Sequence, residues 1–257
     1  MSDEAFADAD LTQDAFLGGR VRLWQPRRGY RSGVDPVLLA ASVAAVPGQR
    51  VLDLGCGAGA AMLCLGARVP GLDLTGVELQ PAYARLARRN AADAECPARV
   101  VTADVAALPP DLRQETFDHV IANPPYFEPA RRQGAADPGR ETGLAGPTPL
   151  ADWVATAARR TAHGGSVTFI QRVERLPELL AAFDARLGGI EFLPLAPRVG
   201  RPARLILLRG RKGGRAAFRA LAPLILHAGD RHESDAEDYA PAVAAILRDG
   251  APLRFSP

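Results

Sequence analysis

The chain has 257 residues, of which 47% are hydrophobic and 23% charged, and its formal net charge is +2. This composition excludes a largely disordered chain, and the length suits one large α/β domain. Five of the 29 acidic residues lie in the first 16 positions, which hold no basic residue, so the remaining chain is more basic than the net charge suggests.

The basic charge is almost entirely arginine, since Lys212 is the only lysine. The planar guanidinium fork suits phosphate oxygens, which favours a nucleic-acid partner. Codon bias in a GC-rich genome produces the same excess of arginine, because alanine is also abundant. The composition alone leaves both interpretations open.

Targeting and redox signals indicate a cytoplasmic protein. Cys56, Cys64 and Cys96 have no CxxC spacing, so neither a disulfide framework nor a zinc site is expected. The longest apolar stretch, residues 37–46, is far too short to span a membrane, and the acidic N-terminus lacks an export signal. We therefore expect a reducing environment, no metal and no membrane contact.

The first 49 residues precede the regular part of the sequence. Within them, Asp35 followed by Pro36 is typical of a helix start, with Asp35 as the capping residue. We expect residues 1–49 to form an N-terminal extension.

From residue 50 onward, short β-rich runs alternate with helical patterns, which is typical of a sheet with crossover helices on both faces. We expect about seven strands, at residues 50–54, 72–79, 98–104, 117–122, 166–171, 190–195 and 203–210. Residues 211–257 follow as an apolar run and a terminal helix. No linker divides the chain, so residues 1–257 are interpreted as one domain with its core sheet at 50–210.

Local signals predict where the helices begin and end. Pro81 suits the first turn of a helix, and Thr148 followed by Pro149 predicts another start, with Gly164 and Gly165 ending that helix. The sequence Ser234-Asp235-Ala236-Glu237 has the spacing of a capping box and predicts the start of the last helix.

A glycine-rich turn follows the strand at 50–54. "VLDLGCGAG" places Asp53, Gly55, Gly57 and Gly59 between a strand and a helix, at the edge where open α/β sheets bind ligands. Glycine there lets the backbone approach a ligand closely. The spacing is GxGxG rather than GxGxxG, and no Gly-Lys-Ser/Thr follows, which argues against a dinucleotide or a nucleoside triphosphate.

Acidic residues stand at the ends of the next two strands. Glu78 lies 19 residues past Gly59, where a carboxylate can accept both hydroxyl protons of a ribose. Asp104 ends the third strand and can accept a hydrogen bond from the exocyclic amine of an adenine. Together these positions predict a nucleoside pocket.

Residues 50–126 resemble the class I methyltransferases that use S-adenosylmethionine (SAM), with "DLGCGAG" and "GVEL" similar to the first two motifs of that class. The resemblance implies a Rossmann-like, seven-stranded, mostly parallel sheet whose last strand is antiparallel. It also implies SAM as the cofactor. The residues expected to contact it are Asp35, Asp53, Gly55, Cys56, Gly57, Gly59, Glu78, Leu79, Asp104, Val105 and Asn123.

Asn123-Pro124-Pro125-Tyr126 follows the strand at 117–122 and suits methyl transfer to a flat amino group. The carbonyls of Asn123 and Pro124 can each accept one N–H, which turns the nitrogen lone pair toward the methyl donor. Tyr126 and Phe127 can stack on a base pulled out of its helix. NPPY at this position resembles the fourth motif of methyltransferases that act on adenine N6, cytosine N4 or glutamine amides.

A longer stretch, roughly residues 12–250, resembles the tRNA1(Val) adenine-37 N6-methyltransferase family, on "GYRSGVDPVLLAA", "ANPPYF", Arg140-Glu141 and Trp153. The sequence departs from the family at Asp35-Pro36, where a small residue is more usual, and in an arginine-rich segment at 128–147. The resemblance implies that Tyr30 and Asp35 close over the methionine end of SAM. RNA would bind to Tyr30, Phe127, Arg131, Arg132, Arg140 and to Arg27, Arg28, Arg31, Arg198, Arg201, Arg211, Lys212 and Arg215.

Two acceptors fit these motifs. The first is N6 of adenine in RNA, above all tRNA. The alternative is N5 of a glutamine in a protein such as a release factor or ribosomal protein, and a helical domain before the sheet would favour it. His119, His163, His227 and His232 have no ligand spacing and are interpreted as structural or surface residues.

Overall fold

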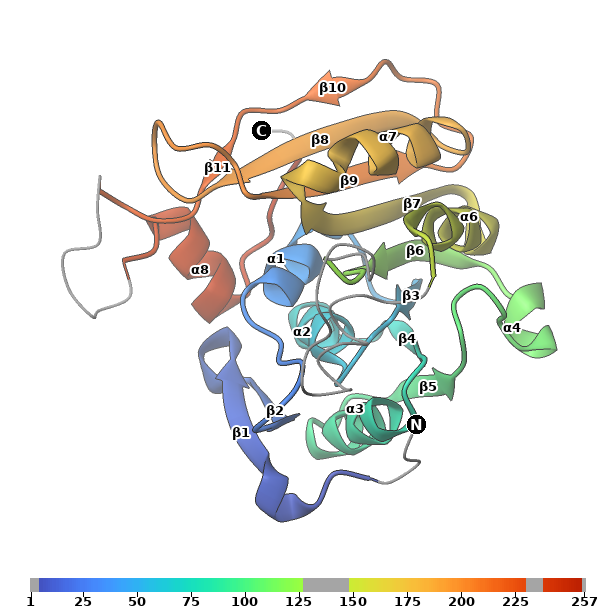
Figure 1. The fold of residues 1–257 in the computed structure, drawn as a ribbon, viewed down its shortest axis with the longest axis vertical. Coiled ribbons are helices and arrows are strands. Elements are labelled where there is room, and N and C mark those ends of the chain that lie inside the picture. Colours follow the sequence, from blue (N-terminus) through green and yellow to red (C-terminus); the bar gives the residue numbers. More distant parts are fainter. Residues whose placement is uncertain (1–4, 127–147, 230–237, 256–257) are drawn as a thin grey trace, which may run out of the picture.

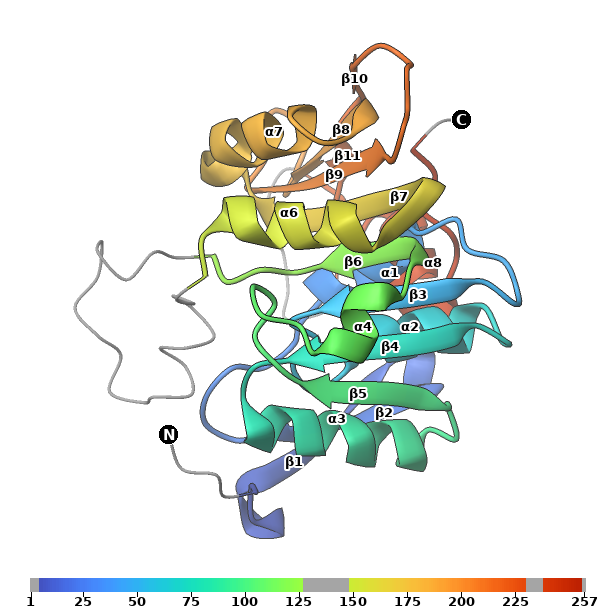
Figure 2. The ribbon, with the colours of Figure 1, turned by 90° about the vertical axis from the view of Figure 1, so that its right-hand side faces the viewer.

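The computed structural model describes residues 5–126, 148–229 and 238–255. Its centre is a twisted sheet, whose strands lie side by side across Figure 2, with helices in front of and behind it. The first four strands of the sheet along the chain are parallel: β3 (Arg50–Leu54), β4 (Asp73–Glu78), β5 (Ala98–Thr102) and β6 (Phe117–Ala122). The later strands are β7 (Thr161–Arg172), β8 (Gly188–Ala196) and β9 (Leu205–Arg211).

The long strands follow the order β8-β9-β7-β6-β3-β4-β5. β9 is antiparallel to both of its neighbours, and the other neighbouring pairs of long strands are parallel. The predicted Rossmann-like sheet with an antiparallel last strand is therefore confirmed. Two short strands extend it: β10 (Arg219–Ala220) and β11 (Leu224–Ile225) both pair parallel with β8, so the described sheet has nine strands instead of seven.

Alternating residues of the strands supply two apolar layers. On one face, Ile170 and Leu207 pack with α1 (Asp35–Ser42), α2 (Ala60–Arg68) and α3 (Pro81–Asp93). On the other, Phe169 and Leu208 pack with α6 (Leu150–Arg160) and α7 (Leu176–Asp184), and Leu112 of α4 (Pro110–Gln114) belongs to the same layer. Period-two burial is the expected signature of strands covered on both faces.

An N-terminal β-hairpin, which the sequence analysis did not predict, lies beside α3 at the lower left of Figure 1. It consists of β1 (Leu11–Phe16) and β2 (Val21–Pro26), paired antiparallel from Leu11↔Pro26 to Phe16↔Val21. Its turn packs against α8 (Pro241–Asp249), the last helix of the chain. A β-carbon on Gly18 in that turn would lie 2.8 Å from the Arg248 carbonyl oxygen, so the turn needs glycine.

Four predicted helix boundaries are wrong. Val34, not Asp35, is the N-cap of α1, and the Asp35 carboxylate instead accepts a hydrogen bond from Tyr126. α6 begins at Leu150 with Pro149 as its N-cap, while the Thr148 hydroxyl donates to the Asp104 carboxylate at 3.2 Å. In both cases a distant partner takes the side chain that local rules assign to a cap.

The third error concerns Gly164 and Gly165, which lie inside β7, because α6 already ends at Arg160. A β-carbon on Gly165 would lie 2.6 Å from the Asp118 carbonyl oxygen, so this glycine permits close approach of β6.

The last helix also starts later than predicted. α8 begins at Pro241, with Ala240 as its N-cap, so the capping box at 234–237 does not open it. The box itself lies outside the described residues.

Candidate active site

The glycine-rich turn connects β3 to α2 with three left-handed residues. Gly55, Gly57 and Gly59 have φ of 68°, 56° and 91°. A β-carbon on Gly55 would lie 2.4 Å from the ring of Trp153 in α6, so both the backbone angle and the packing require glycine. The turn thus presents bare backbone at the carboxyl edge of the sheet, with Cys56 buried inside it.

Glu78 ends β4 and closes the turn from the side. Its carboxylate accepts hydrogen bonds from the backbone N–H groups of Gly57 (2.9 Å) and Gln80 (2.8 Å). Burial raises the pKa of Glu78, while these N–H donors oppose that rise. The hydrogen bond to Gly57 thus ties the Glu78 carboxylate to the glycine turn. Leu79 follows Glu78 directly.

Asp53 lies one strand away from Glu78 and is 2% exposed. Its carboxylate accepts from the Met62 backbone N–H at 3.2 Å. Burial raises the pKa of Asp53 to about 8, the Met62 hydrogen bond lowers it, and the negative charge of Glu78 raises it further. A cation placed beside this buried pair of acids would favour the charged form of both.

Asp104, the predicted last residue of the third strand, lies two residues beyond the end of β5, which ends at Thr102. Its carboxylate accepts from the Ala106 N–H at 2.8 Å and from the Thr148 hydroxyl at 3.2 Å. The next residue, Val105, is buried. Asp104 therefore ties the loop after β5 to the start of α6 at the same sheet edge as Glu78.

Asn123 follows β6 with a hydrogen-bonding mismatch in its side chain. The amide nitrogen donates to the Tyr30 hydroxyl at 3.3 Å. The amide oxygen, in contrast, is buried and has no partner among the described residues. Because a buried acceptor without a donor is costly, this oxygen is suited to a ligand N–H.

The prolines after Asn123 are fixed by a residue that the sequence analysis missed. Gln171 near the end of β7 is fully buried, and its amide nitrogen donates to the carbonyls of Pro124 (3.3 Å) and Pro125 (3.4 Å). Its amide oxygen accepts from the Arg172 N–H at 2.8 Å. A polar residue that ends the apolar run "VTFI" was the available signal.

Tyr30 and Asp35 reach this edge from the segment after the hairpin. The Tyr30 backbone exchanges hydrogen bonds with the Tyr83 hydroxyl (2.9 and 3.1 Å), and its ring lies 3.7 Å from where a Gly57 β-carbon would stand. Asp35 accepts from the Tyr126 hydroxyl. The structure thus brings Tyr30, Asp35, Asn123 and Tyr126 together above the glycine turn.

The buried environment shifts the pKa of each ionisable group in this corner. Burial, followed by the Asp35 charge, raises the pKa of Tyr30 to about 12 and that of Tyr126 further. Burial raises the pKa of Asp35, while the Tyr126 hydrogen bond and the Arg172 charge lower it. Both tyrosines are therefore neutral hydrogen-bonding groups at neutral pH.

Asn90 is a second missed residue. It is fully buried on α3, and its side-chain amide bonds both the N–H (2.8 Å) and the carbonyl (3.0 Å) of Trp24 and the carbonyl of Ala58 (2.9 Å). One side chain therefore joins the hairpin to the glycine turn. An asparagine at a core-facing position of an amphipathic helix was the signal.

The described arginines expected to bind RNA come from separate segments of the chain. Phe127, Arg131, Arg132 and Arg140 lie outside the described residues, as does His232. Arg31 pairs with Asp14 at 2.6 Å, Arg198 pairs with Asp238, and Lys212 donates to the Ala158 carbonyl. The residues of this set that are exposed are Arg27, Arg28, Arg31, Arg201, Arg211 and Arg215.

Within residues 5–126, 148–229 and 238–255, no three His, Cys, Asp or Glu side chains are grouped as they would be around a metal ion. None of the helices in the described part of the chain has both the length and the apolar character needed to cross a bilayer.

Comparison with known proteins places the chain among methyltransferases. A family model described as a methyltransferase domain matches residues 51–137, which contain the glycine turn and the NPPY motif. The tRNA1(Val) (adenine(37)-N6)-methyltransferase of Yersinia pestis is 30% identical over 208 residues, which cover 76% of this chain and 80% of that protein. The enzyme of the same name from Aeromonas hydrophila is 29% identical and covers 81% and 87%.

Solved structures agree on the fold. A protein described as a predicted O-methyltransferase from Agrobacterium tumefaciens superposes with a TM-score of 0.68 at 32% identity, covering 86% of this chain and 98% of that one. The 16S rRNA N2 G1207 methyltransferase of Thermus thermophilus, solved with AdoMet and guanosine, has a TM-score of 0.53 at 20% identity and covers 79% and 50%.

The glycine turn, the strand-end acids and the NPPY corner thus occur in a chain with this sheet order and these relatives. The chain is a class I SAM-dependent methyltransferase, and it belongs to the family of the tRNA1(Val) (adenine(37)-N6)-methyltransferases.

Proposed function

We propose that this enzyme methylates the N6 amino group of an adenine in RNA, and that the RNA is a tRNA. The observation that carries the proposal is the buried, unpartnered amide oxygen of Asn123 next to the Pro124 carbonyl. Two fixed acceptors match an amino group, which offers two N–H donors. A hydroxyl acceptor offers only one.

We propose that SAM lies against the glycine turn, with its ribose at Glu78 and its adenine beside Asp104 and Val105. Bound there, SAM supplies a methyl group on a positively charged sulfur. Asp35, Asp53 and Tyr30 would surround the end of the cofactor that lies next to Asn123. The raised pKa values of Asp35 and Asp53 support this, because a cationic ligand group would restore the charge of buried carboxylates.

Asn123 and the Pro124 carbonyl orient the acceptor in this mechanism. The lone pair of an exocyclic amine is delocalised into its ring, so the nitrogen is a poor nucleophile until its two N–H bonds are held out of plane. The Asn123 oxygen accepts one N–H and the Pro124 carbonyl accepts the other with the lone pair that Gln171 does not use. After transfer, the extra proton leaves the nitrogen to water.

Tyr126 would hold the flat face of the adenine. Its hydroxyl is tied to Asp35, so its ring orientation is fixed before a base arrives. Phe127, beyond the described residues, would extend this platform. A base that stacks here must leave its own helix or loop, which is least costly in a single-stranded loop of a tRNA.

The glutamine alternative finds less support. A helical domain before the sheet would favour a protein substrate, and among the described residues that precede the sheet, residues 11–26 form a hairpin followed by one short helix. We also infer that the chain is one domain, because both apolar layers share the same sheet, and that it works in the cytoplasm, where its three free thiols stay reduced.

Labelled methyl transfer from SAM to unmodified tRNA transcripts, followed by nucleoside mass spectrometry, tests the proposal. We expect N6-methyladenosine as the product. Asn123→Ala should lower the rate on the order of 10²-fold or more while SAM affinity, measured by calorimetry, changes little. If the label enters a glutamine peptide and not the tRNA, the proposal is overturned. If Asn123→Ala lowers SAM affinity as much as it lowers the rate, Asn123 has a structural role instead.

A further inference from the structure

A pocket of about 410 Å³ lies between α4 and α6, on the sheet face opposite α1 and α2. Its polar lining comes from Arg113 and Gln114 of α4 and from Thr156, Arg159 and Arg160 of α6. Val105, Leu108 and Pro110 form an apolar side. No described carboxylate lines it, so the pocket is positively charged.

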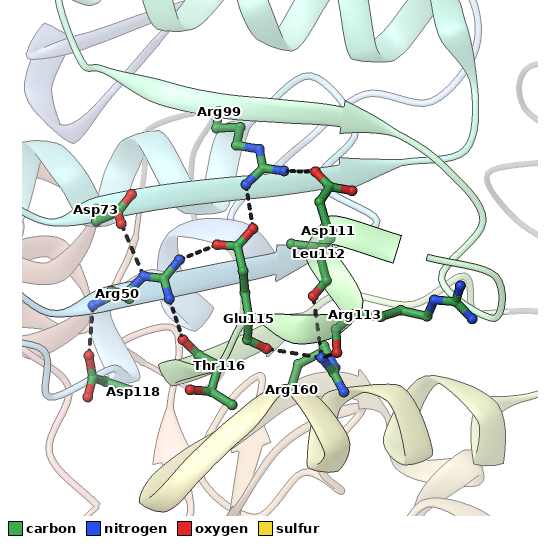
Figure 3. A network of polar contacts seen from close by, with 10 residues as sticks. All are labelled: Arg50, Asp73, Arg99, Asp111, Leu112, Arg113, Glu115, Thr116, Asp118 and Arg160. Carbon is green, nitrogen blue, oxygen red and sulfur yellow. Dashed lines mark hydrogen bonds and ion pairs between the residues drawn. The ribbon is translucent and has the colours of Figure 1, made fainter. Parts of the chain in front are cut away.

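The acids of α4 face away from this pocket. Asp111 pairs with Arg99 at 2.5 Å, and Glu115, just after the helix, pairs with both Arg99 (2.6 Å) and Arg50. Figure 3 shows this network, with the guanidinium of Arg113 extending to the other side. The helix therefore separates a neutralised acidic side from an arginine side.

The three guanidiniums of the pocket have different tasks. Arg160 donates to the carbonyls of Leu112 and Arg113 in α4 and of Glu115 just after it, so it holds the end of this short helix against α6. Arg159 donates to the Thr156 hydroxyl at 3.0 Å, while its side chain and that of Arg113 are exposed. Arg113 and Arg159 are available to a ligand without loss of a helix cap.

The charges in the pocket repel one another. Burial is the largest cause that lowers the pKa of Arg160, and the positive charges of Arg159 and Arg113 lower it further. An anion between them would relieve this repulsion. Guanidinium forks, a hydroxyl and an amide together fit the oxygens of a phosphate group.

The pocket adjoins the candidate active site through one segment. Val105 lines it and directly follows Asp104, whose carboxylate also holds Thr148 at the start of α6. Arg113, Arg159 and Arg160 lie near the ends of α4 and α6, shortly before β6 and β7 begin. An extended polyanion bound there would therefore run along the helix layer toward the edge at which the strands end, which Val105 adjoins. Arg113, Arg159 and Arg160 are not among the arginines that the sequence pattern suggested.

We propose that this pocket binds a backbone phosphate of the RNA substrate and so positions the RNA for entry of its adenine at the Asn123–Tyr126 corner. The inference rests on the proposed function, because RNA supplies the phosphate. Such a contact positions the substrate without reading its sequence. It also makes RNA affinity depend on salt through counterion release.

The test measures binding of an unmodified tRNA transcript by fluorescence anisotropy at several salt concentrations. In Arg113→Glu/Arg159→Glu we expect binding about 10-fold or more weaker and a salt slope smaller by about two. SAM affinity should stay within about twofold, which also reports that the variant is folded. Arg160 is left intact because it holds α4.

Two variants serve as controls. Arg186→Glu/Arg254→Glu makes the same charge change at exposed positions outside the pocket and should retain most of the affinity. Arg113→Lys/Arg159→Lys keeps the charge but not the fork, so its affinity should fall between that of the wild type and the reversed pair. If the reversed pair matches the Arg186→Glu/Arg254→Glu control in affinity and slope, the proposal is overturned.

The remaining outcomes distinguish a failure of the phosphate-pocket proposal from a failure of the proposed function. Pocket-dependent tRNA binding without methylation of any tRNA adenine would support the pocket and overturn the function. Methylation unaffected by the reversed pair would overturn the pocket alone. Inorganic phosphate binding in thermal-shift assays, with tRNA affinity unchanged in the variants, would show a site for a small free anion and also overturn the proposal.

Discussion

At the scale of single residues, the Asn123–Tyr126 corner contains one unsatisfied acceptor and one satisfied pair of carbonyls. The Asn123 oxygen has no described donor, while Gln171 supplies the carbonyls of Pro124 and Pro125 from the neighbouring strand. Proline removes backbone donors from the turn, so no N–H of Pro124 or Pro125 competes for these oxygens. Gln171 is therefore positioned to fix the direction in which the Pro124 carbonyl points.

Replacing Gln171 with methionine tests this positioning role. The side chain keeps its length but loses both hydrogen-bonding groups, so the proline carbonyls and the Arg172 N–H lose their partner. We expect kcat to fall about 10²-fold, because a displaced acceptor spoils alignment of the amine. KM for RNA and SAM affinity should change by less than about threefold, which steady-state kinetics and calorimetry can check.

A Gln171→Glu variant gives the matched control. Burial beside two carbonyl oxygens should raise the pKa of the new carboxyl, whose protonated form can still donate a hydrogen bond. Activity relative to wild type should then decline as the pH rises through that pKa. A uniform loss of activity, SAM affinity and stability at every pH would reduce Gln171 to a packing residue.

At the scale of elements, the hairpin reaches the active site through α3. Asn90 bonds Trp24 of β2 and Ala58 of the glycine turn, and Tyr83 holds the backbone of Tyr30. Both side chains project from one helix toward segments more than 30 residues away. The geometry of the glycine turn thus depends on docking of the N-terminal segment.

Asn90→Ala should therefore weaken both the fold and cofactor binding. It leaves the N–H and carbonyl of Trp24 and the carbonyl of Ala58 without their buried partner. We expect a loss of about 2–4 kcal/mol in the free energy of unfolding, measured in urea. SAM affinity should fall as well, because the turn loses a support.

Asp93→Ala provides the comparison on the same helix. Asp93 accepts from the exposed indole N–H of Trp24 at 2.8 Å, so its removal should cost less than about 1 kcal/mol. Equal effects of the two substitutions would contradict the role given to Asn90.

At the scale of the whole molecule, the sequence predicts what local patterns determine. The long strands lie within about two residues of their expected positions at most ends, because apolar runs between glycines leave few alternatives. β7 begins five residues earlier than expected, at Thr161. The order of the strands followed from the family resemblance rather than from periodicity.

The failures share a physical cause. Asp35 and Thr148 satisfy local rules for a cap, but their side chains bond Tyr126 and Asp104, 91 and 44 positions away. The hairpin likewise depends on Asn90, 66 positions from Trp24. The local sequence can mark a side chain such as Asn90 or Gln171 as unusual, but it does not identify a partner that lies far away along the chain.

One arginine in the C-terminal part of the molecule makes a cluster of polar contacts within the chain. Arg198, after β8, was expected to contact RNA. It donates instead to the Asp238 carboxylate and to the carbonyls of Ala228 and Gly229, and its side chain is 12% exposed. Asp238 also bonds His227 at 2.6 Å. This cluster connects the end of β8 to the segment that leads into α8.

Arg198→Ala should therefore act on stability and not on RNA binding. Its removal leaves Asp238 and two carbonyls with fewer donors, so we expect a loss of about 1–3 kcal/mol in the free energy of unfolding. Hydrogen exchange should rise in residues 224–229 and 238–249, and tRNA affinity should stay within about twofold. Arg201→Ala, an exposed neighbour, should change stability by less than about 0.5 kcal/mol. A drop in tRNA affinity with unchanged stability would instead return Arg198 to the RNA-binding surface.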